Sequence, residues 1–133
     1  MTFLDTGIPV GAVLARHPEH AACREAMEDS EGPFTDAHAL AETFAALTGF
    51  YKVPVAAAAE LTLGLMSSVA VEPLPLADYE KAIGEAQRRG VMGGGIYDSL
   101  DATFARRKGA RRIVTRNPSH FARAAPDLEI LTP

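Results

Sequence analysis

Hydrophobic and polar positions along the chain follow two alternating patterns. Short apolar runs predict β-strands, at residues 2–4, 34–35, 69–71, 112–115 and 128–131. Between them, apolar residues recur every three or four positions, which predicts helices at residues 8–15, about 19–29, 37–48, 54–68 and 76–89. One more helix is expected with Asp98 in its first turn, before a turn at Gly109. Short strands alternating with helices predict an α/β fold, a three-layer α/β/α sandwich with a mainly parallel central sheet.

Two of the expected helices have a clear apolar side. In the helix at 37–48, Leu40, Phe44 and Leu47 recur at helical spacing and predict the buried face, which Glu42 flanks. In the helix at 76–89, apolar spacing predicts that Tyr79 and Ile83 face inward. Asp36 stands just before the first of these helices and is a candidate N-cap.

The chain has 133 residues, and we expect one domain spanning residues 1–133. With 47% hydrophobic and 23% charged residues, the composition is typical of a soluble globular protein. No apolar run is long enough for a membrane span, and the first strand leaves no room for a leader, so no membrane association is expected. The single cysteine, Cys23, cannot form an internal disulfide, which favours a cytoplasmic location.

The charge is unevenly distributed along the chain. The net charge is -4, yet residues 88–123 contain nine Lys or Arg residues and only two acids, Asp98 and Asp101. A local basic patch of this kind attracts a polyanionic ligand even on an acidic protein. The alternative is that cations such as Arg106 and Arg107 only stabilise the end of a helix. Both interpretations stay open at this point.

Polar residues are expected to meet at one edge of the sheet, since ligands of open α/β sheets bind at the carboxyl ends of strands. Asp5 ends the first strand, and Asn117 follows the strand at 112–115. Asp98 begins the preceding helix, and Glu42 reaches the same edge if its helix packs beside the first strand. Oxygen ligands select Mg²⁺ or Mn²⁺, which support phosphodiester hydrolysis. The alternative is that these acids only cap helices or interact with helix dipoles.

Other nucleotide and metal motifs are absent. The glycines of residues 90–95 lack the lysine and the spacing of a P-loop. The four histidines have no metal-ligand spacing, and His120 alone stands near the expected edge, where it either contacts a phosphate or is structural.

Four segments of the sequence resemble the PIN domain family, and most closely its VapC-like toxins of bacterial toxin–antitoxin pairs: FLDTG, ALAETFAALT, GGGIYDSLDATFA and IVTRNPSHF. They occur in the family's order and cover nearly the whole chain. The resemblance implies an endoribonuclease that uses Mg²⁺, or Mn²⁺, in an acidic pocket. By motif position it implies catalytic roles for Asp5, Glu42, Asp98 and Asn117, with Asp5 and Asp98 binding the metal.

The resemblance also implies supporting roles around these four residues. Thr6 and Thr115 match hydroxyl residues that orient ligands or water. Asp101 stands where the family more often has an apolar residue or histidine; it shares a helical face with Asp98, so it either adds a charge through water or is a surface residue. Two arginines are expected to position the RNA backbone: Arg112 and Arg116.

The expected partners follow from the same resemblance. VapC-like proteins bind a small VapB-like antitoxin that inserts a segment near the active site, and they form homodimers. The apolar faces of residues 40–47 and 54–66 offer surfaces for such contacts, or else pack the core. Two other functions remain open: a non-catalytic PIN-like module that binds RNA or a partner, and a phosphoryl-transfer or small-molecule domain that uses the same acidic edge.

Overall fold

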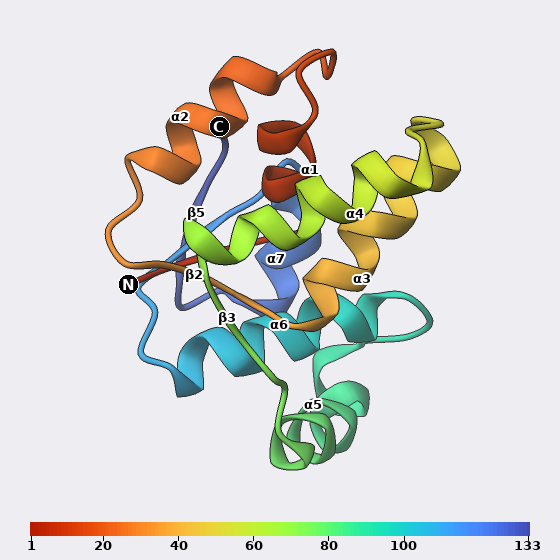
Figure 1. The fold of residues 1–133 in the computed structure, drawn as a ribbon. Helices are drawn as coiled ribbons and strands as arrows, with labels where there is room; N and C mark the ends of the chain where they lie inside the picture. Colours follow the sequence, from red (N-terminus) through yellow and green to blue (C-terminus); the bar gives the residue numbers. More distant parts are fainter.

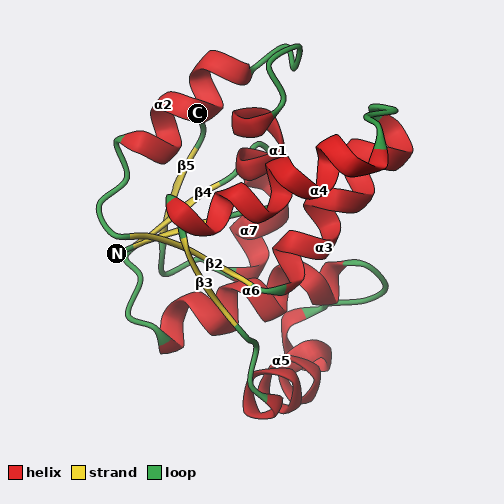
Figure 2. Ribbon diagram, in the orientation of Figure 1, coloured by secondary structure: helices red, strands yellow, loops and turns green.

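A computed structural model describes residues 1–133 and contains one sheet of five parallel strands (Figures 1 and 2). In chain order the strands are β1 (Thr2–Leu4), β2 (Pro33–Asp36), β3 (Ala70–Glu72), β4 (Arg112–Val114) and β5 (Glu129–Leu131). Their spatial order is β3-β2-β1-β4-β5. The first strand is therefore central, with β2 and β4 as its parallel neighbours. This confirms the predicted parallel sheet and places the last strand at an edge.

Helices connect the strands. They are α1 (Gly7–Val13), α2 (His20–Glu28), α3 (His38–Ala45), α4 (Val55–Gly64), α5 (Leu76–Arg89), α6 (Gly95–Arg107) and α7 (Pro118–Ala124). A π-helical turn, η1 (Ala46–Phe50), continues α3, and a 3₁₀ turn, η2 (Leu65–Ser67), follows α4. No helix is both long and apolar enough to cross a membrane.

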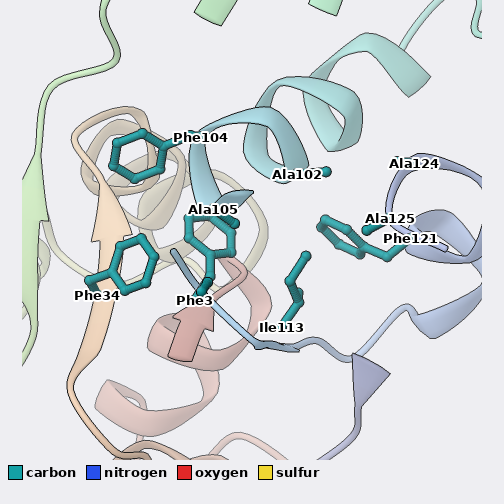
Figure 3. Packing of buried hydrophobic residues seen from close by; sticks show 10 residues of the cluster. Phe3, Phe34, Ala102, Phe104, Ala105, Ile113, Phe121, Ala124 and Ala125 are labelled. Atoms are coloured by element: carbon teal, nitrogen blue, oxygen red, sulfur yellow. The ribbon is translucent and has the colours of Figure 1, made fainter. Parts of the chain in front are cut away.

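One face of the sheet is covered by α6 and α7. Because side chains alternate along a strand, Phe3 of β1 and Ile113 of β4 point to this face. Figure 3 shows the rings of Phe3, Phe34 and Phe104 packed edge to face, with centroids 5.6 to 6.1 Å apart. Phe121 of α7 completes the same cluster. The α6 helix, which carries Asp98, is thus fixed to the central strands by a fully buried aromatic contact.

The opposite face is covered by α1 and α2. Leu4 of β1 packs there with Ile8 of α1 and Cys23 of α2. The two helices are in close contact, because a Cβ atom added at Gly11 would lie only 2.4 Å from the Cys23 Sγ. Helices on both faces confirm the three-layer α/β/α architecture.

The orientation of α5 differs from the prediction. Tyr79 and Ile83 were expected to face inward, but their side chains are 39% and 62% exposed. The buried residues of α5 are Asp78 and Ala82. The Asp78 carboxylate accepts hydrogen bonds from Arg107 Nε of α6, at 2.9 and 3.0 Å. The buried side of α5 therefore carries an ion pair with the neighbouring helix.

Candidate functional site

The ends of β1 and β4 are linked by a buried hydroxyl. The Asp5 N–H donates to the Val114 carbonyl at 3.0 Å, and Thr115 Oγ1 donates to Asp5 Oδ2 at 2.6 Å. Thr115 is fully buried, and its Oγ1 also accepts the Asn117 N–H at 3.0 Å. Burial raises the pKa of Asp5, and the hydrogen bond from Thr115 opposes that shift. Thr115 thus connects the acid of one strand to the loop after the other.

A second pair of acids joins β2 to α6. Asp36, at the end of β2, is buried, and its Oδ1 accepts the Ala39 N–H at 2.9 Å, which caps the start of α3 as expected. Asp101 of α6 faces it. Burial raises the pKa of Asp101 well above its usual value, and repulsion from Asp36 and a hydrogen bond between the two carboxyls raise it further. Asp101 therefore lies near Asp36, Asp5 and Glu42, although it lines neither of the two hollows described below.

Glu42 and Asp98 approach the same space from α3 and α6. Burial is the main cause that raises the pKa of each, and the nearby Asp5 carboxylate raises both further. Each carboxylate has a histidine beside it, which lowers its pKa in part. His38 Nε2 lies 3.2 Å from Glu42 Oε1, and His120 Nδ1 lies 3.6 Å from Asp98 Oδ2. The acids thus interact across one shared space.

The role of His38 was not predicted from the sequence. It precedes Glu42 by four residues, and this spacing on a helix is a signal that could have indicated the pair. The His38 ring also stacks on that of Tyr97, with centroids 6.1 Å apart and planes inclined by 16°. One histidine therefore joins the acid on α3 to an aromatic ring on α6.

Two hollows meet at these acids. The Asp5 hollow, about 380 Å³, is lined by residues that include Asp5, Thr6, Arg116 and Asn117. The Tyr97 hollow, about 630 Å³, is lined by residues of the glycine-rich loop before α6, together with Tyr97 and Arg123. Both are lined by the same three residues: Glu42, Asp98 and His120. The structure thus brings all four predicted catalytic residues to this edge of the sheet.

A model of the PIN domain matches residues 2–126 of the chain. The chain belongs to the PIN domain family. Its structure is similar to that of Mycobacterium tuberculosis VapC20, a sarcin–ricin loop cleaving toxin, with a TM-score of 0.71 and 21% identity over 85% of this chain and 87% of that one.

Two further solved structures share the fold. Rickettsia felis VapBC2, bound to a DNA fragment from its promoter, gives a TM-score of 0.70 with 20% identity over 99% of this chain and 98% of that one. FitAB bound to the IR36 DNA fragment gives a TM-score of 0.71 with 17% identity, over 100% of this chain and 95% of that one. Comparison with curated proteins gives no significant match. At these identities the likeness establishes the PIN fold.

Most of the basic residues of this PIN domain are neutralised locally. Of the nine in residues 88–123, seven form ion pairs: Arg88 and Arg89 with Glu85, Arg106 with Asp127, Arg107 with Asp78, Lys108 with Glu72, Arg112 with Glu129, and Arg116 with Glu19. Arg112 begins β4, at the opposite end of that strand from Thr115, and lines neither hollow. We therefore assign Arg112 no part in the site. Arg111 and Arg123 have no carboxylate partner.

The carboxylates at this site determine which metal ion the PIN domain could bind. No three Asp, Glu, His or Cys side chains are grouped so that they alone could hold an ion. Mg²⁺, however, is usually bound by one or two carboxylates, with water and substrate phosphates as its other ligands. Asp5 and Asp98 fit that mode, because both line the Asp5 hollow and each repels the other's negative charge.

Proposed function

We propose that this PIN domain is the toxin of a toxin–antitoxin pair, and that it hydrolyses RNA as a divalent-metal-dependent endoribonuclease. The observation that carries the proposal is the Asp5 hollow, which is lined by three carboxylates from separate segments, Asp5, Glu42 and Asp98. The Asp5 carboxylate raises the pKa of both of the others. The PIN fold and its similarity to VapC20, a toxin that cleaves the sarcin–ricin loop, support it.

Each residue of the proposed site has a distinct part. Asp5 and Asp98 would hold Mg²⁺ or Mn²⁺, which when bound polarises phosphoryl oxygens and lowers the pKa of water. Thr115 fixes the Asp5 carboxylate by its hydrogen bond. The raised pKa of Glu42 makes it a better proton acceptor for an attacking water. Asn117 also lines the Asp5 hollow and offers a neutral amide oxygen there.

The two hollows favour cleavage within a strand. Because the hollows share Glu42, Asp98 and His120, a strand that lay through both would pass the acids at an internal phosphate. Arg116 lines the Asp5 hollow, where it could contact the RNA backbone, although it also pairs with Glu19.

The test replaces one acid and compares it with a matched change elsewhere. Asp98→Asn should abolish Mg²⁺-dependent cleavage of single-stranded RNA, because it removes a charge that holds the metal. Asp29→Asn makes the same chemical change at an exposed position at the end of α2 and should leave cleavage intact. Circular dichroism checks that both variants are folded. Cleavage by Asp98→Asn at the wild-type rate would refute the proposal.

A non-catalytic RNA-binding module is the second candidate. It is favoured by the neutral Asn117 and by the absence of three acids grouped around one point. A Mg²⁺ and Mn²⁺ titration distinguishes the two candidates, since the module would bind RNA at every metal concentration and never cut it.

We also propose a VapB-like antitoxin and a second copy of the chain as partners. Large apolar side chains are exposed on η1, α4 and η2: Phe50 at 78%, Val55 at 65%, Leu63 at 62% and Met66 at 57%. Exposed apolar surface of this kind is typical of an interaction site. Co-expression with the product of a short reading frame directly upstream should yield a complex without ribonuclease activity, and sedimentation of the free protein tests the homodimer.

A further inference from the structure

The Tyr97 hollow contains an exposed aromatic ring in a fixed orientation. Tyr97 is 58% exposed, although its ring stacks on that of His38. His38 is in turn held by Glu42, so the aromatic ring lies directly beside the proposed acids. Exposed rings next to a reaction centre suit an unpaired nucleobase, because every base has a flat face that stacks on an aromatic side chain.

The same hollow contains a cation that no carboxylate neutralises. Arg123 is the only Lys or Arg that lines it, and it forms no ion pair, unlike seven of the nine basic residues in this part of the chain. Its Nη1 donates to the Gly90 carbonyl at 3.1 Å, which holds the guanidinium at the rim of the hollow. The other N–H groups stay available, and a guanidinium pairs well with phosphate.

The size of the hollow is the third observation. At about 630 Å³, the hollow has the size of a small-ligand site.

We propose that the Tyr97 hollow binds the nucleotide next to the cleaved bond of single-stranded RNA, with Tyr97 stacking on its base and Arg123 binding its phosphate. The proposal rests on the ribonuclease function above and adds a subsite to it. It requires an unpaired base, since a base within a helix has no free face to stack on Tyr97.

The base contact is tested by binding to two probes: a short single-stranded oligoribonucleotide and its abasic counterpart. All proteins carry Asp98→Asn, so that Mg²⁺ can be present without cleavage, and fluorescence anisotropy reports affinity. The parent should bind the probe with bases about tenfold more tightly. Tyr97→Ala should abolish that preference, and Tyr97→Phe should keep it. Tyr79→Ala removes another exposed tyrosine ring, which lies outside the hollow, and should leave the affinity for both probes unchanged.

The phosphate contact has a different signature. Arg123→Gln should weaken binding of both probes equally and make the salt dependence shallower, by about 0.7 in the slope of log K against log salt. Arg111→Gln removes the other unpaired cation of residues 88–123, which lines neither hollow, and should leave the slope unchanged.

Two outcomes would overturn the subsite. One is a Tyr97→Ala variant that still prefers the probe with bases; the other is a parent protein that binds neither probe. Binding here does not depend on catalysis, so a protein that stacks bases on Tyr97 but never cuts RNA would retain the subsite and refute the ribonuclease function.

Discussion

Replacing Thr115 with valine tests the link between the two central strands. Valine keeps the shape of the side chain but removes the hydroxyl that donates to Asp5 Oδ2 at 2.6 Å and accepts the Asn117 N–H at 3.0 Å. Because Thr115 is fully buried, water cannot replace these contacts. The hydrogen bond lowers the pKa of Asp5, so its loss should raise that pKa further.

The size of the effect follows from the two lost contacts. A hydrogen bond to a charged group contributes about 1.5–3 kcal/mol, and a donor left without a partner costs about 1–3 kcal/mol. Together these ranges predict that Thr115→Val lowers the free energy of unfolding by about 2.5–6 kcal/mol near neutral pH. Burial already raises the pKa of Asp5 above its ordinary 3.8, so the wild-type protein and the variant both lose stability as pH rises through the folded-state pKa. The variant loses more stability, because its Asp5 has the higher pKa. The difference in unfolding free energy between the two proteins should therefore become smaller in acid.

Urea unfolding in metal-free buffer measures this difference, with circular dichroism as the signal because the chain has no tryptophan. Thr115→Ser is the matched control, because it keeps the hydroxyl and removes only a methyl group. Equal losses for the two variants at neutral pH would refute the hydrogen-bond argument. So would a Thr115→Val deficit that stays constant between about pH 4 and about pH 7.

Two further predictions concern stability. Asp101 has a raised pKa, so the stability from its protonated form is present below about 3.8 and is lost as pH rises through the folded-state pKa. Asp101→Asn should therefore make the protein more stable at neutral pH and flatten its pH profile in urea titrations; a less stable variant would contradict this. Gly11→Ala should lower the unfolding free energy by about 1–3 kcal/mol, since its Cβ would meet Cys23 Sγ. Gly84→Ala is the control, because a Cβ atom there would have nothing within 4 Å; it should raise the unfolding free energy by about 0.5–1 kcal/mol. Thermal unfolding compares the two variants, and an equal change in melting temperature for both would refute the packing argument.

The alternation of strands and helices could be predicted because it depends on short-range apolar spacing. The first strand, 2–4, and the helix at 76–89 have the predicted bounds. The buried side of α5 could not be predicted from that spacing, because it contains Asp78, whose ion-pair partner Arg107 is 29 residues further along the chain. The break of the helix at 37–48 into α3 and η1 likewise leaves no trace in the apolar pattern.

The site was predictable where it depends on strand polarity. Asp5 and Asn117 follow parallel strands, and they meet at one edge as expected. Asp36 also ends a parallel strand, β2, so the same rule could have placed it at this edge. From the sequence it was assigned only as a helix cap, although it also faces Asp101. The predicted basic patch is mostly paired, because carboxylates such as Glu19 and Asp127 come from outside the basic segment. Charge counted along a sequence does not include such partners.

The central position of β1 has a consequence for folding during synthesis. Its hydrogen bonds to β4 and the contact between Asp5 and Thr115 join residues that are 110 positions apart. Contacts at such separation form late, because a long loop must close before they stabilise anything. On the ribosome, β1 would emerge before the other strands of the sheet and wait for β4, which lies 110 positions later in the chain. A truncated product that ends before Thr115 would therefore have no assembled acidic site.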